Sequence, residues 1–136
     1  MMIATSPRFL RTVLLLDAAS VLPGGVPQVL ATTWLARWTG LEHTLLLSSG
    51  LLLFVYAAFV VWVGGRQPIP AAAVRWVIGC NLAWAVGCLG LIAMTASDLS
   101  LWGVAYLLVN IVAVTVFAAL QWVGLRQANG ALHPAG

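Results

Sequence analysis

Three polar side chains in this sequence lie inside long apolar runs, each five or six residues from an arginine at one end of its run. They are Asp17, six residues after Arg11; Asn81, six after Arg75; and Gln121, five before Arg126. At a rise of about 1.5 Å per helical residue, the three side chains share one depth, about 8 to 9 Å inside the boundary that the arginines mark. The spacing therefore predicts one polar layer to which three helices contribute.

Hydroxyl groups extend this predicted layer. Ser20 lies three residues after Asp17, on the same side of a helix, and Tyr56 lies in another apolar run. We therefore predict a ligand or proton site formed by Asp17, Ser20, Tyr56, Asn81 and Gln121. A membrane carboxyl group with amide and hydroxyl neighbours could carry a proton or bind a cationic ligand.

The same layer also has a structural interpretation, which the sequence favours. Placing an acidic side chain at the centre of a bilayer costs about 2.5 to 3.5 kcal/mol on insertion scales, and less toward the interface. Asp17 is close enough to the boundary to pair with Arg11, Arg75 or Arg126. In that case the amides of the layer simply tie the helices together.

Other residues are predicted to line the core or a pocket of the bundle: Trp84, Cys88, Asn110 and Phe117. Trp84 lies well within an apolar run, and we expect it to contact the interior of the bundle near Cys80 or Cys88. Two stripes of the third run are expected to face inward, namely Asn81, Ala85 and Cys88, and beside them Gly79, Ala83 and Gly87. The small residues of the second stripe have the spacing that permits close helix approach.

Four apolar runs must position these side chains. They cover residues 12–35, 44–63, 71–94 and 101–124. Each run is long enough to cross a bilayer as a helix, and the short connections favour antiparallel neighbours. With 62% apolar and 7% charged residues, the chain lacks the polar surface of a soluble domain of its size. We therefore predict an all-α polytopic membrane protein, an antiparallel bundle of four transmembrane helices (1–128) with a flexible C-terminal tail (129–136).

The first run contains Pro23 and Pro27, with Gly24 and Gly25 between them. Proline removes a backbone hydrogen bond of the helix, and paired glycines loosen the backbone further. We therefore predict that the first helix is kinked or broken near Pro23 to Pro27. A discontinuous helix around a binding site, as in transporters, and a simple packing kink both fit this pattern, and the packing kink is favoured.

The charges predict the orientation of the four runs. One side of the membrane receives Arg8, Arg11, Arg66, Arg75 and Arg126, and the other receives Arg37 together with Glu42 and Asp98. Because arginine-rich connections stay in the cytoplasm, we predict cytoplasmic N- and C-termini in a bacterial inner membrane. Tryptophans favour both interfaces, and Trp34, Trp38 and Trp102 map to the outer one while Trp62, Trp76 and Trp122 map to the inner one.

The sequence offers no catalytic or metal-binding constellation. It contains no GxSxG, HExxH or phosphate-binding loop. His43 and His133 fall on opposite sides of the membrane, and Cys80 and Cys88 are too far apart along a helix for a disulfide. We therefore predict no enzyme activity, no metal and no cofactor. The expected partners are the lipid bilayer and either another membrane protein or a second copy, and no nucleic acid.

Short segments of the chain resemble a known group of proteins. They are residues 16–20 (LDAAS), 81–84 (NLAW), 118–121 (AALQ) and 124–126 (GLR). These segments resemble a group of small four-helix bacterial integral membrane proteins without assigned activity, and the likeness covers residues 8–128. The resemblance implies the four-helix architecture and adds no mechanism. Pro23 and Pro27 depart from the smoother first helix of that group.

Two functions fit the sequence. The first is a non-enzymatic accessory or assembly subunit that packs against itself or against a larger membrane complex, which the short connections and the missing catalytic set favour. The second is a small proton- or cation-coupled transporter that acts as a homo-oligomer with Asp17 as the intramembrane acid. In length, number of spans and an acid in the first helix, the chain resembles small multidrug-resistance exporters, an architectural match only.

Overall fold

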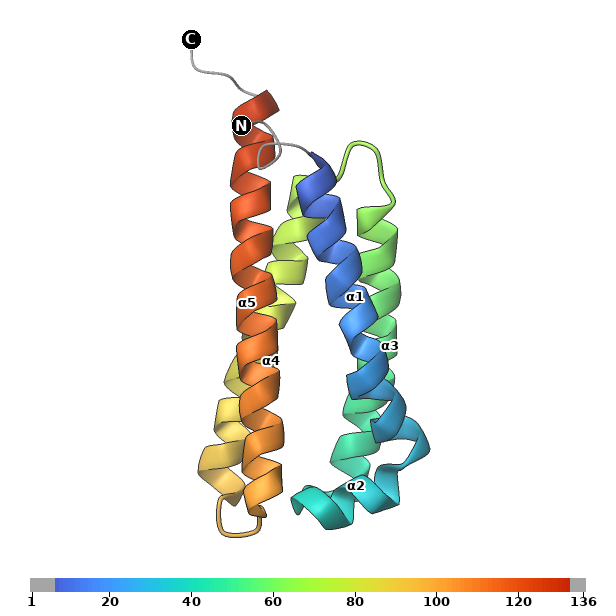
Figure 1. Cartoon of the computed structure of the whole chain (residues 1–136), viewed down its shortest axis with the longest axis vertical. Coiled ribbons are helices and arrows are strands. Elements are labelled where there is room, and N and C mark those ends of the chain that lie inside the picture. Colours follow the sequence, from blue (N-terminus) through green and yellow to red (C-terminus); the bar gives the residue numbers. More distant parts are fainter. Residues whose placement is uncertain (1–6, 133–136) are drawn as a thin grey trace.

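The computed structural model describes residues 7–132, and the regular structure in this part of the chain is entirely helical. Its helices are α1 (Pro7–Leu30), α2 (Thr32–Thr39), α3 (His43–Gly64), α4 (Ala71–Thr95) and α5 (Leu101–Leu132) (Figure 1). Of these, α1, α3, α4 and α5 contain segments long and apolar enough to cross a membrane. The prediction of an all-α chain with four helices of spanning length is therefore confirmed. Residues 133–136 of the predicted tail, and with them His133, lie outside the described residues.

The first helix ends earlier than the apolar run predicted. α1 ends at Leu30, and the chain then forms the separate helix α2, which lies across one end of the molecule (Figure 1). α2 buries Leu35 and Thr39 on one side and exposes Trp34 and Trp38 on the other. The first run contains no charged residue between Asp17 and Arg37, so the sequence alone does not show that the first helix ends at Leu30.

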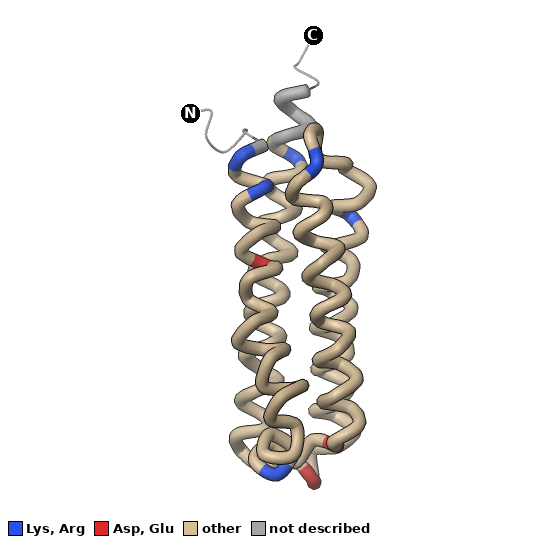
Figure 2. The backbone as a smooth tube through the Cα atoms, turned by 90° about the vertical axis from the view of Figure 1, so that its right-hand side faces the viewer, with Lys and Arg blue, Asp and Glu red and all other residues tan. Residues whose placement is uncertain are grey.

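The long helices associate as two close pairs. α1 lies alongside α3, α4 lies alongside α5, and α1 also contacts α5, whereas α3 and α4 contact each other only slightly. α1 begins and α5 ends at the same end of the molecule, where most of the arginines lie (Figures 1 and 2). We refer to it as the arginine end, and it carries Arg11, Arg66, Arg75 and Arg126.

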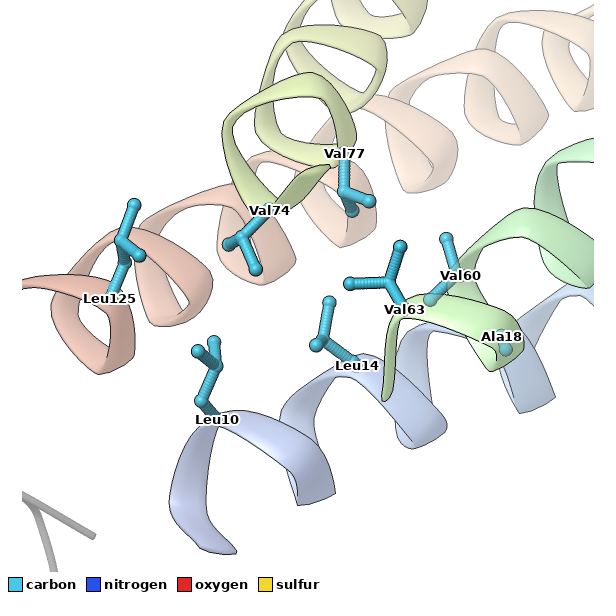
Figure 3. Close-up of a cluster of buried hydrophobic side chains, with 8 residues drawn as sticks. All are labelled: Leu10, Leu14, Ala18, Val60, Val63, Val74, Val77 and Leu125. Carbon is cyan, nitrogen blue, oxygen red and sulfur yellow. The ribbon is translucent and has the colours of Figure 1, made fainter. Parts of the chain in front are cut away.

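Apolar side chains fill the interior toward both ends. Near the arginine end, residues of α1, α3, α4 and α5 point toward one another (Figure 3). They are Leu10, Leu14, Ala18, Val60, Val63, Val74, Val77 and Leu125. A second buried cluster toward the other end contains Leu35, Leu41, Leu46, Cys88 and Leu107. The polar side chains described below are thus enclosed by apolar packing.

The prolines of the first run lie inside α1 and do not interrupt it. α1 continues through Pro23 and Pro27 and ends three residues after Pro27. A helix can tolerate the loss of these backbone donors where neighbouring helices cover the segment, and Gly25 is buried beside Phe54 of α3. A kink at these prolines stays a prediction.

The glycine-rich side of α4 points away from the other described helices. A Cβ atom added at Gly79, Gly87 or Gly90 would meet no atom within 4 Å, and Ala83 is exposed. The expectation that this stripe packs inside the bundle is therefore wrong. The neighbouring stripe, with Asn81, is the buried one, because a polar amide in hydrocarbon must face other helices.

α2 is held against the start of α5 by close backbone contacts. Ser100 donates from its hydroxyl to the carbonyl oxygen of Trp38 at 2.6 Å and from its backbone N–H to that of Thr39 at 3.1 Å. A Cβ atom at Gly103 would lie 2.0 Å from the Thr39 carbonyl oxygen. Gly40 ends α2 with a φ of +83°, in the left-handed region that favours glycine. These glycines fix the position of α2.

Candidate functional site

One polar side chain from each long helix meets in a single layer. Asp17 comes from α1, Tyr56 from α3, Asn81 from α4 and Gln121 from α5. The exposed fractions of Asp17, Asn81 and Gln121 are 3%, 2% and 0%, and Tyr56 is half-buried. Residues from all parts of the sequence therefore come together in one buried group, which we call the Asp17 layer.

The carboxylate oxygen Oδ2 of Asp17 is the centre of this layer. It accepts hydrogen bonds from the Tyr56 hydroxyl at 2.5 Å, from Nε2 of Gln121 at 2.6 Å and from Nδ2 of Asn81 at 3.1 Å. Nδ2 of Asn81 also donates to Oε1 of Gln121 at 3.0 Å. Donors from three different helices thus converge on one acceptor of α1, so the buried carboxyl group of Asp17 is satisfied by amide and hydroxyl partners.

The Tyr56 hydroxyl lies between two acceptors. Besides Oδ2 of Asp17, it lies 3.1 Å from Oδ1 of Asn81. A phenol carries a single proton and can donate it to only one of these oxygens at a time. The layer therefore offers two arrangements of its hydrogen bonds, with Tyr56 donating either to Asp17 or to Asn81.

The arginines do not neutralise Asp17. Arg11 donates from Nε to the carbonyl oxygen of Gly64 at 2.7 Å and from Nη2 to that of Arg66 at 3.0 Å, so its side chain covers the C-terminal end of α3. Among the described residues, no ion pair joins an arginine to Asp17. The predicted pairing with Arg11, Arg75 or Arg126 is therefore wrong, because amide and hydroxyl groups at the same depth reach the carboxylate instead.

Ser20 does not join the layer. Its side chain is exposed, and its hydroxyl donates to the backbone carbonyl oxygen of Asp17 at 2.6 Å, within the same helix. Serine in a helix commonly satisfies its hydroxyl in this way. The buried stripe of α1 passes from Asp17 through Val21 to Gln28.

The predicted pocket residues make no hydrogen bond to the Asp17 layer among those of the described residues. Trp84 packs against the second apolar cluster, to which Cys88 belongs, and its Nε1 donates to Oδ1 of Asn110 at 3.4 Å. Nδ2 of Asn110 donates to the backbone carbonyl oxygen of Tyr106 at 2.9 Å. Phe117 is half-buried, and Cys80 is exposed. Trp84 therefore takes part in helix packing between α4 and α5.

A second polar group, centred on Gln28, did not emerge from the sequence. Gln28 is 3% exposed. Its Nε2 donates to the Leu46 carbonyl oxygen at 3.0 Å and to the Ser49 hydroxyl at 2.7 Å, and its Oε1 accepts from the Tyr106 hydroxyl at 2.6 Å. The available signal was the spacing of Gln28, eleven residues after Asp17 and thus on the same face of one helix.

The bond between Tyr106 and Gln28 should contribute measurably to stability. In a double-mutant cycle of Tyr106→Phe and Gln28→Leu, we expect a coupling free energy of about 0.6 kcal/mol and at most about 1.7 kcal/mol, the range for hydrogen bonds between membrane helices. Unfolding in mixed detergent micelles, followed by tryptophan fluorescence, gives the four free energies. Strictly additive effects would contradict the hydrogen bond.

The Asp17 layer is filled by its own side chains. The polar atoms of Asp17, Asn81 and Gln121 are paired mainly with one another, so a ligand could enter only by displacing these bonds. Among the described residues, no three His, Cys, Asp or Glu side chains lie close enough together to hold a metal ion. Comparisons of this chain with protein-family models, with curated proteins and with solved structures give no match.

Proposed function

We propose that this chain is a non-enzymatic integral membrane protein, an accessory or assembly subunit that packs against itself or against a larger membrane complex. The observation that carries the proposal is the Asp17 layer, in which the buried polar groups of all four long helices bond to one another. Polar groups used in this way hold helices together and leave the outer surface for contacts with lipid and protein. The proposed architecture is an antiparallel four-helix bundle with a kinked first helix.

The proposed orientation has both chain ends in the cytoplasm of a bacterial inner membrane. Its support is the arginine distribution, since only Arg37 lies away from the arginine end. Arginine-rich segments are retained on the cytoplasmic side during insertion. The resemblance of residues 8–128 to small four-helix bacterial membrane proteins is consistent with this architecture.

The open side of α4 is the proposed contact surface for the partner. Gly79 and Gly87 lie on it with open space above them, and small residues at such spacing let another helix approach closely. We expect Gly79→Leu and Gly87→Leu to abolish association while leaving the fold intact. The control is Ala58→Leu, at an exposed alanine of α3.

Association can be tested in mild detergent with the full chain expressed in its native membrane. Blue-native electrophoresis and co-purification report whether it migrates with itself or with another membrane protein. Loss of the associated form in the two glycine variants, but not in Ala58→Leu, would support the proposal. A wild-type chain that migrates only as a monomer would overturn it.

A small proton- or cation-coupled transporter is the second candidate, and a specific observation favours it. Asp17 is a buried acid with partners from three other helices, and the Tyr56 hydroxyl lies between two acceptors. Intramembrane acids of this kind mark ion and proton pathways.

For a transporter, Asp17→Asn should abolish pH-driven uptake into proteoliposomes, because an amide cannot exchange a proton. For an accessory subunit, the same variant should fold and associate as the wild type does. Two measurements on the same preparation separate these outcomes. Uptake driven by a pH gradient reports transport, and native electrophoresis reports association. Full transport by Asp17→Asn would eliminate the transporter function as proposed here.

A further inference from the structure

The arginine end carries positive charge that no acidic side chain of the protein offsets. The chain contains three acidic residues. Asp17 is buried in its polar layer, while Glu42 precedes α3 and Asp98 lies between α4 and α5, both toward the opposite end. Among the described residues, therefore, no acidic side chain lies beside the exposed guanidinium groups of Arg66, Arg75 and Arg126. These three positive charges are therefore available to an anionic group from outside the described residues.

Each of these three arginines is accompanied by an exposed tryptophan. On α3 and the turn after it, the Arg66 guanidinium lies 5.0 Å from the ring centroid of Trp62. On α5, Trp122 and Arg126 are four residues apart and so lie on one face. On α4, Trp76 follows Arg75 directly. The exposed fractions of Trp62, Trp76 and Trp122 are 52%, 71% and 48%.

Two of these pairs line shallow surface depressions. Arg75 and Trp76 line one together with Ala72. Trp122 and Arg126 line another together with Val123 and Gln127. Each depression thus has a cationic group beside apolar surface, at the level where a spanning helix meets the headgroups.

We propose that the Trp–Arg pairs on α3, α4 and α5 bind anionic phospholipids through their headgroups. A guanidinium forms charge-assisted hydrogen bonds to phosphate oxygens, and an indole ring packs at the boundary between headgroup and acyl chain. A phospholipid presents both chemistries at the spacing of adjacent side chains, whereas a soluble anion would leave the indole rings unused. The negative charge of an anionic lipid also offsets the positive charge of the arginines at this end.

Lipid preference can be measured in vesicles that contain the purified protein. Phosphatidylcholine vesicles receive equal small fractions of brominated phosphatidylglycerol or brominated phosphatidylcholine, and quenching of tryptophan fluorescence reports the lipid in contact with the indole rings. For wild type we expect stronger quenching by brominated phosphatidylglycerol. Each Arg→Gln change at Arg66, Arg75 or Arg126 should weaken phosphatidylglycerol binding at its own site about fivefold. This factor corresponds to the loss of about 1 kcal/mol, the attraction of one basic residue near the surface of an anionic membrane.

The matched control is Arg37→Gln, because Arg37 also neighbours a tryptophan, Trp38, but lies at the end that carries Glu42 and Asp98. This variant should keep the preference for phosphatidylglycerol. A variant that combines Arg66→Gln, Arg75→Gln and Arg126→Gln should lose the preference for phosphatidylglycerol. If this triple variant keeps the wild-type preference, or if Arg37→Gln loses as much of it as the triple variant, the proposal is overturned.

If the triple variant fails to insert into vesicles, the dependence of the wild-type preference on salt concentration tests the proposal instead. Screening by added NaCl should reduce the wild-type preference, and a preference that salt does not change would reject the proposed headgroup contacts.

Discussion

Replacing Asp17 by alanine should lower the free energy of unfolding by about 3 kcal/mol or more. Oδ2 of Asp17 is the acceptor for the buried amides of Asn81 and Gln121, and each buried donor left without an acceptor costs about 1–3 kcal/mol. A cavity at a site that is 3% exposed adds to this loss. Titration with sodium dodecyl sulfate in mixed micelles, followed by tryptophan fluorescence, measures the change.

Two variants separate the role of Asp17 from a general effect of mutation in α1. Asp17→Asn keeps the shape of the side chain and one acceptor oxygen, so its loss should be much smaller than that of Asp17→Ala. Ser20→Ala removes only a hydrogen bond within the same helix and should be close to neutral. If Asp17→Ala unfolds at the same denaturant fraction as Ser20→Ala, the Asp17 layer does not hold the helices together.

Replacing Gly103 by alanine should destabilise the contact between α2 and α5 by about 1–3 kcal/mol, the usual cost of forcing an extra group into a packed site. The added Cβ atom would lie 2.0 Å from the Thr39 carbonyl oxygen and 2.9 Å from its carbon, both backbone atoms that cannot rotate aside. α2 must then move away from α5. Near-ultraviolet circular dichroism should detect this movement.

The spectroscopic signal has a structural origin. Trp38 stacks on both Trp34 and Trp102, each with ring centroids 5.3 Å apart, so the stack joins α2 to α5. Gly24→Ala is the matched control, because Gly24 lies in α1 and its added Cβ atom would meet no atom within 4 Å. It should leave the spectrum unchanged and alter stability by between zero and about 1 kcal/mol in the favourable direction. An unchanged tryptophan spectrum in Gly103→Ala would show that α2 is not fixed by this contact.

The sequence by itself determined the class of the fold and the level of the candidate site. Apolar runs of sufficient length require helices that can cross a membrane, because hydrocarbon leaves backbone groups no other way to be satisfied. Counting residues from the arginines put Asp17, Asn81 and Gln121 at one depth, and in the structure these side chains bond to one another. This works because the rise per residue of a helix is constant.

The tertiary structure decided which faces meet and which partner each polar group takes. In the structure, Ser20 and the glycines of α4 lie on the outer surface. Asp17 has amide and hydroxyl partners in place of arginines, and Tyr106 bonds to Gln28. The tertiary structure also separated α2 from α1 at Leu30. Helical periodicity defines several possible stripes along each helix but not the rotation of one helix against the next. That rotation is settled only when all helices pack together and every buried polar group must find a partner at once.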